Sequence, residues 1–241
     1  MDHAVCENIK MKKIVVLTGA GISAESGIKT FRDSDGLWEN HRIEDVATPE
    51  GWEHDPTLVL NFYNRRRAQL MSVSPNDGHR ALADLEQDYE VEVITQNVDD
   101  LHERAGSTRV LHLHGELRKV RSSRFEELIY PWDKDLNMGD LCARGHQMRP
   151  HIVWFGEAVP MLEKAAALAE KADIFLIVGT SLQVYPAAGL MRYAPPHIPF
   201  YFVDPKPQLS WELEQLPNLT VIAEPASTGV KKVVELLRNS K

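Results

Sequence analysis

Six short runs of apolar, largely β-branched residues recur along the chain and constrain its fold more than any other feature. They lie at residues 12–19, 90–97, 109–115, 173–181, 199–204 and 219–224. Runs of this length and composition are typical of strands that are buried on both faces of a parallel sheet. Segments with helical periodicity occur between or after them, at 78–87, 162–172 and 227–240. This alternation predicts an α/β fold with a doubly wound parallel sheet.

Two longer segments interrupt the alternation. Residues 39–75 carry a helical pattern without a strand, and Asp55 followed by Pro56 is a typical helix start. Residues 116–152 are charged and irregular. We expect these two insertions to form a smaller lobe beside a Rossmann-like large lobe. The large lobe then comprises residues 12–38, 76–115 and 153–241 of one catalytic domain (12–241), and residues 1–11 form an N-terminal extension.

Charge and cysteine content exclude several classes of protein. The net charge is −8 and the basic residues form no stripe, so we expect no nucleic-acid partner. Only two cysteines occur, Cys6 and Cys142, which excludes a disulfide framework and favours a reducing compartment. No apolar run is long enough to cross a bilayer, and the first residues do not resemble a secretory signal. The sequence therefore predicts a cytoplasmic protein without membrane contact, and a monomer.

Four of the apolar runs end in glycine or small polar residues, at 18–21, 96–99, 114–115 and 179–181. Each cluster taken alone is typical of a turn, because glycine, asparagine, aspartate and serine are common in turns. Together they predict a shared crevice, because ligands of open α/β sheets bind beyond the carboxyl ends of the strands. Gly19, Gly21 and Ala24 also match the spacing of a dinucleotide-binding turn. A polar flap at 25–38 replaces the expected second strand and its acidic residue, so a nucleotide is expected but not a standard dehydrogenase.

Six sequence blocks, in order, resemble the signature of a known family. They are "GAGIS", "FRDSDGLW", "TQNVDDLHERAG", "LHLHGEL", "RPHIVWFGE" and "VGTSLQVYPAAGL". The resemblance is to sirtuins, the NAD-dependent protein lysine deacylases, and it extends from about residue 12 to 237. It implies that NAD is consumed by cleavage of its glycosidic bond. The acyl-lysine carbonyl oxygen attacks the ribose as nicotinamide leaves, and the final product is 2′-O-acyl-ADP-ribose.

The resemblance also implies which residues contact NAD. Phe31 in the flap would shield the sugar, while Asn97 and Asp99 would position the nicotinamide and its ribose. Asp204 would accept hydrogen bonds from the adenine ribose and disfavour NADP. The full expected set is Gly19, Ala20, Gly21, Ile22, Ser23, Glu25, Phe31, Arg32, Asp33, Trp38, Gln96, Asn97, Val98, Asp99, Gly179, Thr180, Ser181, Asp204 and Ala226.

A general base is needed to activate a ribose hydroxyl, and imidazole suits neutral pH. From the residues alone, His112 and His114 are nearly equal candidates, since spacing two places them on one strand face. An H-x-H pair could also be half of a metal site. The resemblance assigns His114 as the catalytic base, together with Asn97 and Asp99. The glycine that follows it at the strand end supports this choice, and His112 is expected to be a packed, hydrogen-bonded histidine.

Tyr63 and Arg66 share a face of the expected helix over 56–71. In one sirtuin subgroup such a pair recognises acyl chains that end in a carboxylate, and Ala47 resembles the small residue of that subgroup. The sequence therefore predicts removal of succinyl and malonyl groups, and also of acetyl. The alternative is that Arg65, Arg66 and Arg67 form a solvated basic face. The acylated peptide is expected along Val153, Trp154, Phe155, Gly156 and Glu157, by strand addition.

The chain departs from most sirtuins at their structural zinc site. Ser122 and Phe125 stand about where two cysteines are expected, and the second region keeps only Cys142, with His146 nearby. A structural zinc needs four such ligands, so we expect no zinc. Apolar contacts of Leu128, Ile129, Tyr130 and Trp132 are expected to hold the lobe instead. A site completed by two carboxylates stays open, as do two other functions: mono-ADP-ribosyl transfer, and NAD binding without catalysis.

Overall fold

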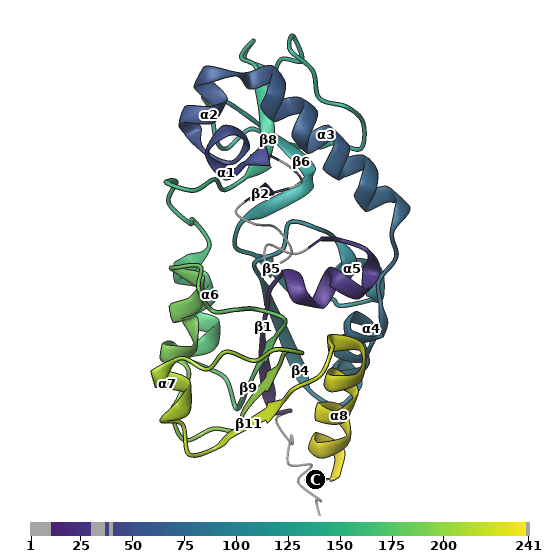
Figure 1. Ribbon diagram of the computed structural model, residues 1–241, viewed down its shortest axis with the longest axis vertical. Helices are drawn as coiled ribbons and strands as arrows, with labels where there is room; N and C mark the ends of the chain where they lie inside the picture. The colour runs from purple at the N-terminus through teal and green to yellow at the C-terminus, as the bar shows by residue number, and fades with distance from the viewer. Residues whose placement is uncertain (1–10, 30–36, 39–40, 240–241) are drawn as a thin grey trace, which may run out of the picture.

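The computed structural model describes residues 11–29, 37–38 and 41–239. A six-stranded parallel sheet forms the large lobe, with the strand order β11-β10-β9-β1-β4-β5. Figure 1 shows this sheet below a second group of helices and strands that forms the small lobe. The predicted doubly wound α/β class is confirmed. The strands are β1 (Lys13–Thr18), β4 (Glu90–Thr95), β5 (Val110–His112), β9 (Ile174–Val178), β10 (Phe200–Val203) and β11 (Leu219–Ile222).

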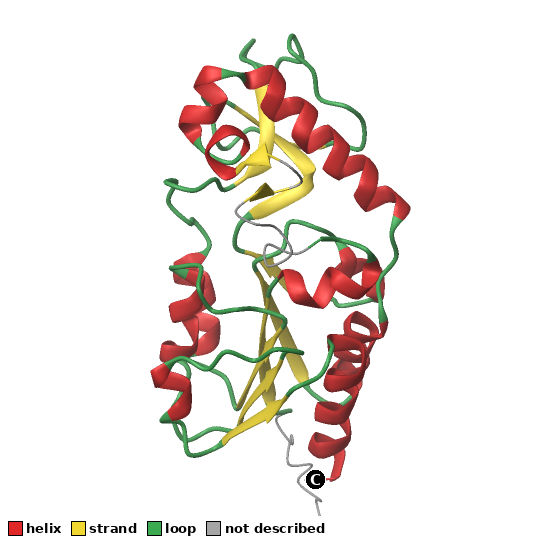
Figure 2. Cartoon of the chain, viewed as in Figure 1, coloured by secondary structure: helices red, strands yellow, loops and turns green. Residues whose placement is uncertain are grey.

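Strand β1 lies in the middle of the sheet and pairs in parallel with β4 and β9. Its residues alternate between two cores: Val15 and Leu17 enter one, and Ile14 and Val16 enter the other. This period of two, with apolar residues on both faces, is why the run is continuously hydrophobic. Helices therefore cover both faces of the sheet, as Figure 2 shows.

One core lies under α6 (Leu162–Ala169), the 3₁₀ helix η4 (Ala187–Tyr193) and α7 (Trp211–Glu214). The other lies under α4 (Asp77–Asp84), the 3₁₀ turn η3 (Leu85–Gln87) and α8 (Ala226–Asn239). The short helix α5 (Leu101–Ala105) follows β4. Every helix in the described part of the chain is too short or too polar to cross a membrane.

The small lobe combines helices from the first insertion with a sheet from the second. The helices are α1 (Ile43–Val46), α2 (Pro49–His54) and α3 (Pro56–Ser72), preceded by the hairpin β2 (Leu37–Trp38) and β3 (His41–Arg42). Asp55 caps α3 as predicted, since its Oδ1 accepts the Leu58 N–H at 2.9 Å. The sheet is antiparallel, in the order β7 (Ile129–Pro131), β6 (Gly115–Ser122) and β8 (Met148–Ile152). The sequence predicted only irregular structure there, because charged side chains obscure the alternation.

Three local details differ from the predictions. Strand β5 ends at His112, not at 115, because Gly115 adopts φ +82° and already starts β6. The first residues of the flap expected at 25–38 belong to a 3₁₀ helix, since η1 spans Ala20–Ser26. The closing helix begins at Ala226, one residue before its predicted start, and the N–H and hydroxyl of Ser227 bind the Glu25 carboxylate at 3.0 and 2.7 Å.

The order of the strands reverses between β1 and β9, since the chain first adds β4 and β5 on one side of β1 and then β9, β10 and β11 on the other. The loops that follow β1 and β9 meet there. The Gly21 N–H donates to the Gly179 carbonyl at 2.8 Å, and the Gly19 N–H donates to the Val178 carbonyl at 3.1 Å. Such a switch point is where ligands of α/β sheets bind.

Candidate active site

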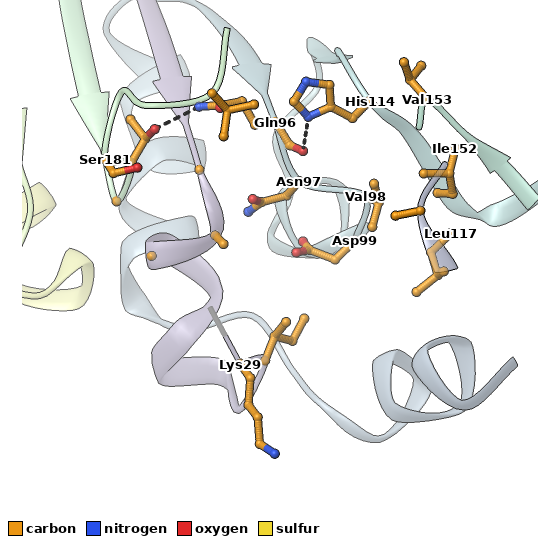
Figure 3. Close-up of a pocket in the computed structure, with 18 of the residues that line it drawn as sticks. Lys29, Gln96, Asn97, Val98, Asp99, His114, Leu117, Ile152, Val153 and Ser181 are labelled. Carbon is orange, nitrogen blue, oxygen red and sulfur yellow. Dashed lines mark hydrogen bonds between the residues drawn. The ribbon is translucent and has the colours of Figure 1, made fainter. Parts of the chain in front are cut away.

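A cavity of about 500 Å³ opens at this switch point and extends to the small lobe. Figure 3 shows Asn97, Asp99 and His114 on one part of its wall, and Leu117, Ile152 and Val153 on another. Four strand termini that the sequence singled out thus converge, as expected. The predicted residues that line it are Gly19, Ala20, Gly21, Gln96, Asn97, Val98, Asp99, His114, Gly179, Thr180, Ser181, Asp204, Ala47, Tyr63, Arg66, Val153, Trp154, Phe155, Gly156 and Glu157.

The glycines in this wall are required by contact between two backbones. A Cβ added to Gly21 would lie 2.7 Å from the Cα of Gly179, and one added to Gly179 would lie 2.3 Å from the Ile22 nitrogen. Gly179 also has φ +61°, in the left-handed region. The spacing had indicated room for a pyrophosphate. The structure shows a further reason, which is the close packing of the β1 and β9 loops.

Several residues expected to contact NAD lie off the cavity. Ile22 and Ala226 are buried in the core between the sheet and α8. Glu25 binds Ser227 and so joins η1 to the start of α8. Only the backbone of Trp38 is described, in β2, so its expected contact with NAD stays a prediction. Phe31, Arg32 and Asp33 lie outside the described residues.

A buried polar network supports Asn97 and Asp99. The Asn97 amide donates to the Ser23 hydroxyl at 3.2 Å, and that hydroxyl donates to the Asp99 carboxylate at 3.0 Å. Burial raises the pKa of Asp99, although the Leu101 N–H and the Ser23 hydroxyl oppose this rise. Ser23 therefore acts beneath the cavity wall, where it orients both side chains.

His79 lies behind Ser23 and is fully buried. Its Nδ1 accepts the Asn76 N–H at 3.3 Å, so the neutral ring carries its proton on Nε2, which lies 3.5 Å from the Ser23 hydroxyl. Burial lowers the pKa of His79 to about 4. A neutral histidine that sequence analysis did not single out thus supports the polar network of Ser23, Asn97 and Asp99.

The two candidate histidines differ in protonation and in position. The His114 Nδ1–H donates to the Gln96 carbonyl at 3.0 Å (Figure 3), and burial lowers the pKa of His114. A neutral ring whose Nδ1 carries the proton keeps a lone pair on Nε2, which suits a general base. Only His114 of the two lines the cavity.

His112 is held by acceptors on both nitrogens. Nδ1 lies 2.9 Å from the Asn97 carbonyl, and Nε2 lies 2.8 Å from the Glu103 carboxylate. Burial alone would lower the pKa of His112, but the bond to Glu103 and its charge raise it above its ordinary value. A ring that donates from both nitrogens is an imidazolium and has no lone pair for a base. The predicted packed, hydrogen-bonded role of His112 agrees with these contacts, but the two rings do not share one strand.

Tyr63 and Arg66 of α3 also line the cavity, and both side chains are buried. The Trp154 indole N–H donates to the Tyr63 hydroxyl at 3.1 Å. Arg67 is also buried and donates to the Leu117 carbonyl at 3.0 Å. Among the three consecutive arginines only Arg65 is exposed. The alternative of a solvated basic face is therefore wrong for Arg66 and Arg67.

Residues 153–157 join the two lobes. The Val153 N–H donates to the His114 carbonyl at 2.9 Å, and the Phe155 N–H donates to the Ala47 carbonyl at 3.0 Å. Phe155 and Gly156 form a turn rather than a strand. At the end of the segment, Glu157 binds Arg149 at 2.7 Å and Arg121 at 3.2 Å.

The ionisation of Glu157 follows from these partners. Burial alone would raise the pKa of Glu157, but hydrogen bonds from Arg149 and from the Trp154 N–H, with the charge of Arg121, lower it below the usual value. Asp204 also lines the cavity, is 2% exposed, and accepts the Lys206 N–H at 2.9 Å.

The region of the expected zinc ligands is packed without a metal-like cluster. The Cys142 thiol donates to the Ser122 hydroxyl at 3.3 Å, and the Phe125 ring meets His146 edge-on at 5.2 Å. No group of three or more His, Cys, Asp or Glu side chains within the described ranges is arranged to hold a metal ion. The residues present therefore do not fit a four-ligand zinc site.

Apolar packing in this lobe differs from the prediction at one residue. Leu128, Tyr130 and Trp132 pack against a small core that includes Val120. Ile129 is 42% exposed, so its predicted role in that core is wrong. Strand alternation explains this, since Tyr130 faces inward and its neighbour in β7 must face outward.

The cavity also contains residues that sequence analysis missed. Gln69 and Leu70 follow Arg66 by three and four positions on α3, so helical spacing could have identified them. Val184, Tyr185 and Pro186 follow Gly179, Thr180 and Ser181 in the block "VGTSLQVYPAAGL", from which only those three were predicted to contact NAD. The others are Ile28, Lys29, Leu117, Ile152, Val159, Pro205 and Lys206.

Comparison with known proteins places this arrangement in a family. The profile of the Sir2 family matches residues 19–186. The chain is 61% identical over 196 residues to an NAD-dependent protein deacylase of Helicobacter pylori, covering 81% of this chain and 86% of the relative. It is 54% identical over 233 residues to an NAD-dependent protein deacylase of Bacteroides thetaiotaomicron, covering 94% and 98%.

Solved structures of Sir2 homologues are also similar to this chain. A Sir2 homologue mutant in complex with ADP-ribose has a TM-score of 0.84 at 37% identity, with 95% of this chain and 93% of that chain covered. A Sir2 homologue in complex with NAD has a TM-score of 0.83 at 37% identity, with coverages of 95% and 91%. With a family match over most of its length and relatives of this identity, the chain belongs to the Sir2 family.

Proposed function

We propose that this protein is an NAD-dependent protein lysine deacylase that removes succinyl and malonyl groups, and also acetyl. The observation that carries the proposal is one cavity with two walls. A neutral His114 lies with Asn97 and Asp99 on the first wall, and Tyr63 lies with Arg66 on the second. The relatives named as NAD-dependent protein deacylases support the general activity. The acyl preference rests on the second wall.

The described residues fit NAD. The glycines of the β1 and β9 loops let the two backbones meet in the cavity wall, and Gly19, Gly21 and Gly179 all line the cavity. In the same lining the Asp204 carboxylate offers acceptors suited to ribose hydroxyls, and the Asn97 amide offers a donor and an acceptor suited to a carboxamide. Bound NAD supplies a ribose whose bond to nicotinamide is weak enough to be cleaved.

The residues of the chain have separate tasks in this reaction. His114 receives a proton from a ribose hydroxyl at Nε2, while its Nδ1–H stays bound to the Gln96 carbonyl. Asn97 and Asp99 are oriented through Ser23. Residues 153–157 hold the peptide that carries the acylated lysine, and their bonds to His114 and Ala47 connect that peptide to both walls.

A buried guanidinium beside a buried phenol is suited to a carboxylate at the end of an acyl chain. Arg66 is 9% exposed and Tyr63 is fully buried. A guanidinium binds a carboxylate with two hydrogen bonds, and the phenol adds a third. Ala47, also in the cavity wall, leaves room for a chain longer than acetyl.

The proposal is tested with one peptide that carries succinyl-, malonyl- or acetyl-lysine, with NAD, and with nicotinamide release and acylated ADP-ribose as readouts. We expect all three to react. We expect Arg66→Met to lower kcat/KM for the succinyl peptide by about 10- to 100-fold, because a hydrogen bond to a charged group is lost.

Arg65→Met is the matched control, because Arg65 precedes Arg66 on the same helix and is exposed. An unchanged succinyl rate in Arg66→Met contradicts the acyl assignment. ADP-ribosylated protein as the main product indicates ADP-ribosyl transfer instead, and no nicotinamide release with any peptide indicates NAD binding without catalysis.

A further inference from the structure

We propose that Trp154 is a positioning residue that orients the Tyr63 hydroxyl toward the acyl end of the substrate. This inference rests on the proposed preference for carboxylate-ended acyl groups. It starts from the hydrogen bond between the Trp154 indole and the Tyr63 oxygen, which joins residues 91 positions apart at 3.1 Å.

The direction of this bond is determined by chemistry. An indole N–H can only donate, so the Tyr63 oxygen is the acceptor. The hydroxyl proton of Tyr63 must therefore point away from Trp154. Both side chains line the cavity, so a carboxylate bound beside Arg66 is an acceptor within the same space. The indole thus selects the rotamer of the hydroxyl that donates to the substrate.

Burial makes this selection effective. Trp154 is 2% exposed and Tyr63 is fully buried, so bulk water cannot replace the indole as the donor. Burial also raises the pKa of Tyr63 above its usual value, despite the nearby Arg66 and Arg149. Tyr63 therefore stays a neutral phenol, which donates a hydrogen bond, rather than a phenolate, which would repel an anionic acyl group.

Trp154 itself is held on three sides. Its backbone N–H donates to the Glu157 carboxylate at 2.8 Å. The Arg149 guanidinium stacks on its ring at 3.2 Å from the centroid, and the Trp52 ring lies 5.8 Å away. Arg149 is in turn bound to Glu157. The indole therefore has little freedom to turn its N–H away from Tyr63.

The test compares two substrates of equal size, a succinyl-lysine peptide and the same peptide whose terminal carboxylate is a carboxamide. The readout is the ratio of their kcat/KM values. We expect Trp154→Phe, which keeps an aromatic ring but removes the N–H, to lower this ratio about 3- to 30-fold, mainly through KM for the succinyl peptide. We expect no further fall in the ratio when the same change is made in a Tyr63→Phe background, because the acceptor is already absent.

Trp132→Phe is the control for loss of an indole N–H from the same lobe, because the Trp132 indole donates to the Asp135 carbonyl and is not part of the cavity lining, and its ratio should equal that of the wild type. If Trp154→Phe slows both peptides by the same factor, Trp154 acts through packing or peptide binding, and the inference is overturned. If Trp154→Phe does not fold, judged by thermal unfolding, Tyr63→Phe alone decides: an unchanged ratio overturns the inference. Failure of the proposed function is separate, since it shows as a wild type that does not favour the carboxylate peptide at all.

Discussion

The two walls of the cavity are built in different ways. The cofactor wall consists of strand termini and loop backbone, held by glycine contacts and by neutral buried groups such as Ser23 and His79. The wall proposed to hold the acyl group (the acyl wall) consists of long side chains from α3 and from residues 153–157, with buried charges at Arg66 and Arg149 and a half-buried charge at Glu157. Changes in the first wall should therefore affect folding and every substrate. Changes in the second should affect the choice among acyl groups.

This contrast between backbone and side chains suits the ligand that each wall is proposed to bind. A dinucleotide is the same in every turnover, so it can be matched by backbone, which no single side-chain substitution removes. The acyl group is where members of one fold can differ, and side chains can be exchanged without altering the sheet. The Arg66→Met and Trp154→Phe experiments probe the acyl wall. The three predictions that follow probe the cofactor wall, from the largest expected effect to the smallest.

His114→Ala should have the largest effect, a fall in kcat/KM of about 10²- to 10⁴-fold for every acyl peptide, because the general base is removed. Steady-state deacylation with succinyl and acetyl peptides measures it. His112→Gln, which alters a ring that lies off the cavity, should lower the rate by a much smaller factor. Equal losses in both variants, or a loss confined to one acyl group, would contradict the division between the walls.

Gly179→Ala should destabilise the protein by about 2–5 kcal/mol, because the added Cβ meets the η1 backbone and the residue has a left-handed φ. Urea unfolding measures the change. Gly139→Ala is the matched control, since Gly139 also has positive φ, at +95°, but nothing lies within 4 Å of its Cβ position. A similar loss in both variants would mean that backbone strain, not contact between the two loops, requires the glycine.

Lowering the pH should destabilise the folded protein through His79, which lies beneath the cofactor wall. Its folded pKa of about 4 lies below the unfolded value near 6.5, so the unfolded state binds more protons between these pH values. The contribution of neutral His79 is present above pH 6.5 and is lost as the pH falls toward 4, by roughly 3 kcal/mol in total. Stability measured from pH 7.5 to 4.5 should therefore fall less steeply in His79→Gln than in the wild type.

The exposed His197 provides the comparison, and His197→Gln should leave the pH profile of stability as it is in the wild type. Identical profiles for His79→Gln and the wild type would show that burial does not lower the pKa of His79 in the folded protein.

Much of the fold was predictable because its signals are local. Buried parallel strands such as β1 and β9 are continuous apolar runs, and the Asp55–Pro56 start of α3 is a matter of adjacent residues. The strands of the small lobe were missed since the charged residues of β6, such as Arg118 and Lys119, obscure its apolar alternation. The break between β5 and β6 was missed because it depends on the close approach of Gly115 to His151.

The cavity was predictable in outline, but individual roles were not. Strand-end clusters identified most of its cofactor wall, while Ile22 and Ala226 prove to belong to the core and Glu25 to a contact with α8. Nothing in the run of three arginines shows that Arg66 and Arg67 are buried and Arg65 is not. That depends on which face of α3 the small sheet covers.

The sequence by itself determined the α/β class, the family and the set of polar strand termini, because periodicity and motifs are properties of neighbouring residues. Only the tertiary structure distinguished His112 from His114, since burial lowers the pKa of His114 while the bond to Glu103 raises the pKa of His112. It also decided the pairing of Trp154 with Tyr63. Protonation and hydrogen-bond direction are set by partners distant in the chain, and folding alone brings those partners together.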